Sequence, residues 1–309
     1  MERMKKLLIM GGSYFLGRVL VEEALKSGGF SVTVLNRGNR PLNLPGVAER
    51  VCDRNDALRL AGILSAERWD IVADTCAYNP AHVKTLFSAL PAAGAGRYVL
   101  ISTVSVYAPT KDLPVSESAP LLAGPLPLPG PAADYGFNKR LAEHAAAAQG
   151  LLRQIPATIL RPAVIYGRYN YAPREPYFFD LVERGEPVVI PKDDLALFQL
   201  VYVKDVARAV LAAAESPKAE GEAYNLAAPE LLSYGRLVEV LEAATGRRIE
   251  TVALPAARID AARIPLPFPL TEHWIHSGEK IVRDLGFSYT KLVPAMRQTY
   301  EDYRKNRQE

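Results

Sequence analysis

Short apolar runs of strand length alternate with amphipathic stretches at helical spacing over the first two hundred residues. The runs predict strands at 7–10, 31–35, 50–52, 70–73, 98–101 and 157–160, and the stretches between them predict helices around 55–64, 81–90 and 135–149. Such alternation is typical of a parallel sheet with helices on both faces. We therefore expect an α/β fold with a doubly wound parallel sheet.

The alternation loosens after Arg161, which places a dinucleotide-binding domain at 1–161 and a smaller, mainly substrate-binding lobe at 162–309. Segments near 200–226 regain the strand and helix pattern, so we expect them to return to the main sheet. The interval 109–131 contains seven prolines and little periodicity. It predicts an irregular surface loop, which could cover a site.

A glycine-rich turn follows the first predicted strand directly and leads into a helical stretch. Its residues are Gly11, Gly12, Ser13, Tyr14, Phe15, Leu16 and Gly17. In this order, strand, turn and helix can hold the pyrophosphate of a dinucleotide, because glycines permit a tight turn and a helix N-terminus offers unpaired N–H groups to an anion. The alternative is a simple strand–turn–helix unit in which the glycines only permit the turn and bind no ligand. The context of the turn favours nucleotide binding.

Tyr135 and Lys139 stand four residues apart in the helix predicted around 135–149. Positions at this spacing share one helix face, so the two side chains project together. A phenol is a weak base at neutral pH, and an adjacent ammonium moves its pKa toward neutrality by favouring the phenolate. The pair therefore fits proton transfer. An ordinary helix with a half-buried tyrosine and a surface lysine has the same pattern.

Three hydroxyl side chains, Ser102, Thr103 and Ser105, follow the buried strand predicted at 98–101. Ligands of doubly wound sheets bind beyond the carboxyl ends of the strands. A hydroxyl at this place can hydrogen-bond a substrate oxygen while a neighbouring phenol transfers the proton. The alternative is that these hydroxyls only cap the end of the strand.

In this order the three motifs resemble the extended short-chain dehydrogenase/reductase family, which contains epimerases, dehydratases and reductases. The resemblance covers nearly the whole chain and includes Leu160 to Gly167, Val201 to Ala207, Tyr224-Asn225-Leu226, and Lys280 with Leu285-Gly286-Phe287. It implies a Rossmann-type fold with a smaller C-terminal lobe. It also implies a nicotinamide cofactor and catalytic roles for Thr103, Tyr135 and Lys139, with Lys139 on the cofactor ribose as well.

The glycine turn departs from the family pattern at Tyr14, where the family has its middle glycine. The departure is similar to the atypical branch that includes the chloroplast stem-loop RNA-binding proteins. That branch can lose its catalytic residues, whereas Thr103, Tyr135 and Lys139 are all present here. The pattern favours an enzyme, with a non-catalytic nucleotide-sensing or RNA-binding protein on the same fold as the alternative.

The end of the second predicted strand contains Asn36, Arg37 and Arg40. Members specific for NAD place a carboxylate there for the ribose hydroxyls, whereas an arginine can pair with the 2′-phosphate of NADP. The sequence therefore favours NADP over NAD. The alternative is a solvated turn with incidental arginines. The resemblance also places Asp53 against the adenine.

The resemblance to sugar-nucleotide members lacks two polar anchors. These members carry an asparagine where Val164 stands, and an arginine near Phe198 and Gln199. A stretch of cationic and aromatic residues after the Tyr-Gly motif could bind an anionic or cyclic substrate instead, or could form a packed loop surface. Its members are Arg168, Tyr169, Tyr171, Arg174 and Tyr177.

The composition changes this picture little. With 309 residues, 49% hydrophobic content and a formal net charge of +3, the chain can bury a full core and has no basic stripe for nucleic acid. Two distant cysteines and the lack of a long apolar run predict a cytoplasmic protein without a membrane partner. His273 and His276 lie beside Glu272 without further ligands, so we expect no metal site. A homodimer is left open.

These patterns together predict an NAD(P)-dependent epimerase, dehydratase or reductase. We expect it to move a hydride between nicotinamide and an alcohol or ketone carbon of a sugar or sugar-nucleotide-like small molecule.

Overall fold

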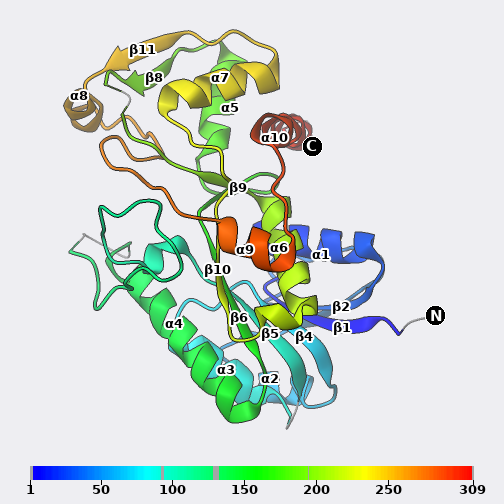
Figure 1. Ribbon diagram of the computed structural model, residues 1–309. Coiled ribbons are helices and arrows are strands. Elements are labelled where there is room, and N and C mark those ends of the chain that lie inside the picture. The colour runs from blue at the N-terminus through cyan, green and yellow to red at the C-terminus, as the bar shows by residue number, and fades with distance from the viewer. Residues whose placement is uncertain (1–2, 92–93, 128–131, 194, 308–309) are drawn as a thin grey trace.

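In the computed structural model, which describes residues 3–91, 94–127, 132–193 and 195–307, a parallel sheet of seven strands forms the centre of the molecule (Figure 1). In spatial order the strands are β10 (Ala223–Leu226), β6 (Ala157–Pro162), β5 (Ala95–Ile101), β4 (Trp69–Asp74), β1 (Lys5–Met10), β2 (Phe30–Asn36) and β3 (Val47–Val51). The order reverses between β4 and β1, and a crevice at such a point is where doubly wound sheets bind ligands. The predicted α/β fold is confirmed.

Helices cover both faces of the sheet. Helices α1 (Phe15–Ser27) and α6 (Val203–Glu215) cover one face, and α2 (Ala57–Leu64), α3 (Pro80–Ala89) and α4 (Ala132–Arg153) cover the other. Successive side chains of a strand point to opposite faces, and β1 divides accordingly. Leu7 and Ile9 join the core under α1, whereas Leu8 and Met10 join the core under α2 to α4.

Short polar side chains mark where several of these helices begin. Asp56 accepts a hydrogen bond from the first turn of α2, and Asn79 does the same for α3. Left-handed glycines end others, such as Gly28 after α1 with φ +71°. The helices predicted from spacing therefore have local signals at their ends as well.

A smaller lobe lies beyond the carboxyl ends of the sheet strands, at the top of Figure 1. It contains α5 (Glu175–Arg184), β8 (Val188–Pro191), α7 (Tyr234–Thr245), β11 (Thr251–Leu254) and α8 (Ala256–Ala261), with β8 and β11 paired in parallel. Its core is aromatic, since the ring of Phe198 stacks on Phe268 at 4.4 Å and lies 5.7 Å from Tyr234.

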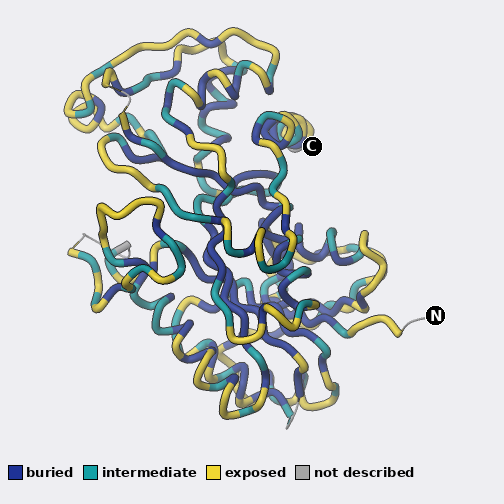
Figure 2. The backbone as a smooth tube through the Cα atoms, in the orientation of Figure 1, coloured by how far each residue is buried: buried dark blue, intermediate teal, exposed yellow. Residues whose placement is uncertain are grey.

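The segment 200–226 belongs to three different layers. Strand β9 (Leu200–Tyr202) pairs with β7 (Val164–Tyr166) outside the main sheet, α6 packs against the sheet, and β10 joins its edge beside β6. Between α6 and β10 lies the short helix η2 (Pro217–Ala219), and α9 (Glu279–Leu285) and α10 (Leu292–Asn306) follow near the C-terminus. The buried positions in Figure 2 run continuously from the sheet into the smaller lobe. The chain thus crosses between the two parts several times.

Candidate active site

The glycine turn lies between the carboxyl end of β1 and the N-terminus of α1. Gly11 has φ +90°, and a Cβ there would lie 2.9 Å from Sγ of Cys76. A Cβ on Gly17 would lie 2.1 Å from the carbonyl oxygen of Gly11, so α1 can approach the turn only with glycine at this position. No side chain caps α1, which leaves N–H groups of its first turn available to an anion. The turn fits a dinucleotide pyrophosphate.

The other residues of the turn differ in what they offer. Phe15 and Leu16 point into the core, so only their backbone faces the crevice, whereas Ser13 is half-buried. Tyr14 is 37% exposed and has the guanidinium of Arg40 4.2 Å from its ring centre. The ring of Tyr171 stacks on Tyr14 at 5.5 Å. Where the family has a glycine, this chain has an aromatic contact with the smaller lobe.

The end of β2 presents two cations. The side chain of Asn36 is held within the protein, because its Nδ2 donates to Glu49 at 2.6 Å and its Oδ1 accepts from the N–H of Gly38 at 2.7 Å. Arg37 and Arg40 are exposed, and within the described ranges neither lies within 4.0 Å of a carboxylate oxygen. Both guanidinium groups remain available to a ligand.

A buried ion pair stands at the end of β4, and the sequence pattern gave no sign of it. Arg54 donates through Nη1 and Nη2 to both oxygens of Asp74, at 2.9 and 2.8 Å. Burial alone would raise the pKa of Asp74, but the adjacent guanidinium holds it below its usual range. The hydroxyl of Tyr98 also donates to this carboxylate at 3.1 Å. Asp53, predicted to contact adenine, is exposed and its carboxylate caps Asn55.

The hydroxyl of Thr103 follows β5 directly and is buried at 8% exposure. Its Oγ1 accepts from the N–H of Ser105 and donates to the hydroxyl of Ser105, both at 3.1 Å, at the start of the short helix η1 (Val104–Val106). The hydroxyl of Ser102 is buried and has no hydrogen-bond partner among the described residues. Thr103 therefore caps a turn and still faces the crevice at the strand end.

Tyr135 projects from the first turn of α4 toward this strand end and is 41% exposed. Partial burial raises the pKa of its phenol, whereas a hydrogen bond with Thr103 and the charge of Arg174 act in the opposite direction. The pKa of Tyr135 is raised overall, and the cation that opposes the rise in this structure is Arg174 of the smaller lobe. Sequence spacing predicted Lys139 for this role.

Lys139 is buried at 2% exposure on the same helix. Its Nζ donates to the carbonyl oxygens of Ala77 and Ile101, at 2.7 and 2.5 Å, and lies 5.6 Å from the ring centre of Tyr78. Burial lowers the pKa of this ammonium to about 8. These contacts fix the ammonium between the ends of β4 and β5.

The cationic and aromatic stretch after Gly167 divides in two. Arg168 pairs with Glu22 of α1 at 3.3 Å, and the hydroxyl of Tyr169 donates to the same carboxylate at 2.9 Å. Tyr171 and Arg174 instead face the crevice, through the stacking on Tyr14 and the influence on Tyr135 given above. The first pair attaches the loop to α1, and the second pair lies beside the candidate catalytic side chains.

At the positions where sugar-nucleotide members carry polar anchors, the side chains of this protein contact other parts of the protein itself. Phe198 is fully buried, and the amide of Gln199 donates to the carbonyl of Ala228 and accepts from the N–H of His276. The Nδ1 of His273 accepts from Leu197 at 3.1 Å. Across the ranges that the structure covers, no group of three or more His, Cys, Asp or Glu side chains could hold a metal ion.

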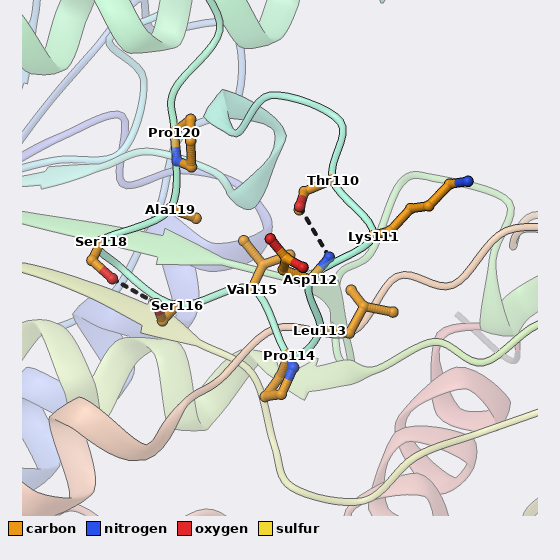
Figure 3. Close-up of a pocket in the computed structure, with 10 residues that line it drawn as sticks. All are labelled: Thr110, Lys111, Asp112, Leu113, Pro114, Val115, Ser116, Ser118, Ala119 and Pro120. Atoms are coloured by element: carbon orange, nitrogen blue, oxygen red, sulfur yellow. Dashed lines mark hydrogen bonds between the residues drawn. The ribbon is translucent and has the colours of Figure 1, made fainter.

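The proline-rich loop surrounds a shallow hollow of about 510 Å³, lined by residues 110–116 and 118–120 of the loop itself (Figure 3). Residues 128–131 of the proline-rich loop lie outside the described part of the chain. The hydroxyl of Thr110 accepts from the N–H of Asp112, and the hydroxyls of Ser116 and Ser118 bond to each other. None of the three candidate catalytic residues lines this hollow, so it is separate from the reaction site.

Comparison with known proteins adds the family. A family model described as the NAD dependent epimerase/dehydratase family matches residues 7–227. The chain belongs to this family. The resemblance drawn from the motifs is therefore confirmed, and the protein is an NAD(P)-dependent enzyme of the short-chain dehydrogenase/reductase type.

Two relatives show the range of this family. The chloroplast stem-loop binding protein of 41 kDa b from Arabidopsis thaliana is 30% identical over 92% of this chain and 75% of its own length. The 2'-dehydrokanamycin reductase of Streptomyces kanamyceticus is 27% identical over 81% of this chain and 70% of its own length. One of these relatives is thus named for stem-loop binding and the other for reduction.

A solved structure agrees in fold. The UDP-glucuronic acid 4-epimerase from Bacillus cereus, in complex with UDP-glucuronic acid and NAD, has a TM-score of 0.76 at 21% identity, over 97% of this chain and 99% of that chain. This likeness supports the Rossmann-type architecture. Within the described residues, no helix is both long and apolar enough to cross a membrane.

Proposed function

We propose that this family member catalyses hydride transfer at an alcohol or ketone carbon of a sugar-like substrate, as an epimerase, dehydratase or reductase. The observation that carries the proposal is the convergence of Thr103, Tyr135 and Lys139. They meet at the carboxyl end of β5. In the sheet, β4 lies between β5 and β1, and the glycine turn follows β1. A binding protein has no need of a phenol, a hydroxyl and a buried ammonium in this arrangement.

Each side chain has a separate task. When bound at the glycine turn, a nicotinamide dinucleotide supplies or accepts the hydride. Tyr135 gives a proton to the substrate oxygen or removes it, as a general acid or base. The hydroxyl of Thr103 turns its single O–H from Ser105 to the same oxygen and orients it by a hydrogen bond. Lys139 has three N–H donors, of which two are used on backbone carbonyls, so one remains for the ribose of the cofactor.

The names of the relatives agree with this substrate class. One relative is named as a reductase of 2'-dehydrokanamycin, and one structural neighbour is named as an epimerase of UDP-glucuronic acid. Both names describe chemistry at a carbon that carries a hydroxyl or a keto group. The loss of the expected polar anchors at Val164 and Gln199 favours a substrate other than a sugar nucleotide.

Tyr135→Phe tests the chemistry, because it removes only the hydroxyl. General acid–base catalysis contributes about 10²–10⁴-fold, so turnover should fall by that order while the Kd for the cofactor stays nearly unchanged. The assay is a screen of keto sugars and sugar nucleotides by nicotinamide absorbance, with product identification for redox-neutral reactions. Tyr177→Phe is the matched control, because this tyrosine of α5 packs against the core and its ring lies 5.1 Å from that of Phe178. No turnover of any substrate by the intact protein would favour the nucleotide-sensing or RNA-binding alternative.

We further propose a preference for NADP over NAD. Arg37 and Arg40 are exposed at the end of β2 and available to a 2′-phosphate, and the neutral Asn36 stands where NAD-specific members have a carboxylate. A charge-assisted contact to phosphate is worth about 1.5–3 kcal/mol, roughly tenfold to a hundredfold in Kd. Calorimetric titration of both cofactors should show this ratio, and Arg37→Ala should reduce it. Tighter binding of NAD by the unmodified protein would refute the preference.

A further inference from the structure

The guanidinium of Arg174 is half-buried and forms no ion pair with the described residues, although its charge acts on the neighbouring carboxylate of Glu175. Its Nη1 donates to the carbonyl oxygen of Ile165 at 3.1 Å, and the structure gives it no other hydrogen bond. In the parts of the chain that the structure covers, no carboxylate oxygen lies within 4.0 Å of it. A guanidinium has five N–H donors, so four of them remain for a ligand.

The buried arginines among the described residues are paired differently. Each has a carboxylate partner at short distance: Arg54 with Asp74 at 2.8 Å, Arg97 with Glu220 at 2.7 Å, and Arg161 with Glu143 at 2.7 Å. This agrees with the general cost of removing a charge from water without a partner. Arg168, only six residues before Arg174, also has its carboxylate, Glu22. The free cation of the loop is therefore Arg174.

The loop holds Arg174 in place. The buried carboxylate of Glu175 accepts from the N–H of Gly167 at 2.9 Å and from Nδ2 of Asn170 at 2.9 and 3.0 Å, which closes the loop upon itself. The ring of Tyr171 is stacked on the glycine turn. A cation fixed in this way loses little conformational entropy when it binds a ligand.

The loop brings Arg174 to the crevice. The ring of Tyr171, three residues before it, stacks on Tyr14 of the glycine turn, and the backbone oxygen of Ile165 holds the guanidinium. Its charge acts on the phenol of Tyr135 and also on the buried carboxylate of Glu175, whose oxygens bond to Gly167 and Asn170. We propose that Arg174 binds an anionic group of the substrate, a carboxylate or a phosphate, adjacent to the carbon whose oxygen Tyr135 protonates or deprotonates. This inference rests on the proposed function and adds the charge of the substrate to it.

Binding of matched sugars to the full chain loaded with NADP tests the inference without turnover. The probes are glucuronate, glucose 6-phosphate and neutral glucose, and the measurement is the Kd by calorimetry. One of the two anionic sugars should bind about tenfold to a hundredfold more tightly than glucose, the worth of one charge-assisted contact. A lower Kd for glucuronate identifies a carboxylate, and a lower Kd for glucose 6-phosphate identifies a phosphate.

Three variants separate the role of the guanidinium from a merely structural one. Arg174→Gln should lose the preference for the anion, Arg174→Lys should keep part of it, and Arg168→Gln should keep all of it because that cation is paired with Glu22. Equal binding of glucose and both anions, or an unchanged preference in Arg174→Gln, would overturn the inference. Anion binding that depends on Arg174 in a protein without turnover would uphold Arg174 as an anion site and refute the proposed function.

Discussion

Glu175 makes the stability of this protein depend on pH in an unusual direction. Its side chain is 3% exposed, and burial raises the pKa of its carboxyl from 4.5 to about 7, although the hydrogen bonds from Gly167 and Asn170 act to lower it. In the unfolded chain the same group ionises near its ordinary value. Between these two pKa values the folded state binds more protons than the unfolded state, so the free energy of unfolding falls as pH rises.

The size of the effect follows from the two pKa values. A difference of about 2.5 corresponds to about 3 kcal/mol in total, of which about 2.5 kcal/mol is lost between pH 5 and pH 8. His276 titrates over part of this range with the opposite sign, because burial lowers its pKa to about 4 and its contribution rises with pH. The variant and the parent chain are therefore compared at each pH, because the contribution of His276 is the same in both and cancels in the difference.

Glu175→Gln is the matched perturbation, because the amide oxygen can still accept from Gly167 while the side chain no longer titrates. Urea unfolding followed by circular dichroism at pH 5, 6, 7 and 8 should show the variant gaining about 2.5 kcal/mol relative to the parent chain over this range. The control is Glu186→Gln, an exposed carboxylate at the end of the same segment. A difference between Glu175→Gln and the parent that stays constant with pH, or that shrinks as pH rises, would refute the reasoning.

Two further predictions concern the crevice. Gly17→Ala should lower the free energy of unfolding in urea by about 1–3 kcal/mol and abolish cofactor binding in a fluorescence titration, because its Cβ would lie 2.1 Å from a backbone oxygen. Gly62→Ala is the control: its Cβ would meet nothing within 4 Å, so neither the free energy of unfolding nor the cofactor affinity should fall. Asp74→Asn should cost about 3–5 kcal/mol because it leaves the charge of Arg54 buried and unpaired. As the control, neutralising the exposed Glu239 should lower the free energy of unfolding by about 1 kcal/mol or less. Equal losses of stability for the changes at Asp74 and Glu239 would contradict the argument.

Much of the fold could be predicted because its signals are local. Apolar runs mark the strands, capping residues such as Asn79 mark helix starts, and the glycine turn combines both kinds of signal at β1. The same patterns place three hydroxyls after a strand and put Tyr135 on one helix face with Lys139, whereas the choice of Thr103 among the hydroxyls came from the family resemblance. Periodicity places residues on an element, and the topology of doubly wound sheets then places the element.

The remainder of the site depends on pairings between distant segments, which periodicity does not contain. Arg54 and Asp74 are 20 residues apart and meet because the turn after β3 and the last residue of β4 both lie at the carboxyl end of the sheet. Arg168 and Arg174 are six residues apart in one loop, yet the first pairs with α1 and the second faces Tyr135. In the sequence the two arginines carry the same charge, which does not distinguish their roles. Only their partners in space show which of them is free.

The repeated crossing of the chain between the sheet and the smaller lobe has a consequence for any attempt to dissect the molecule. A fragment that stops at residue 161 would lack β10, which pairs with β6, and α6, which covers the face of the sheet shared with α1. It would expose Val99 of β5 and Leu160 of β6, both buried on that face, to water. We therefore expect that the segment 1–161 does not fold on its own. We expect heat to melt the whole chain in a single cooperative transition rather than lobe by lobe.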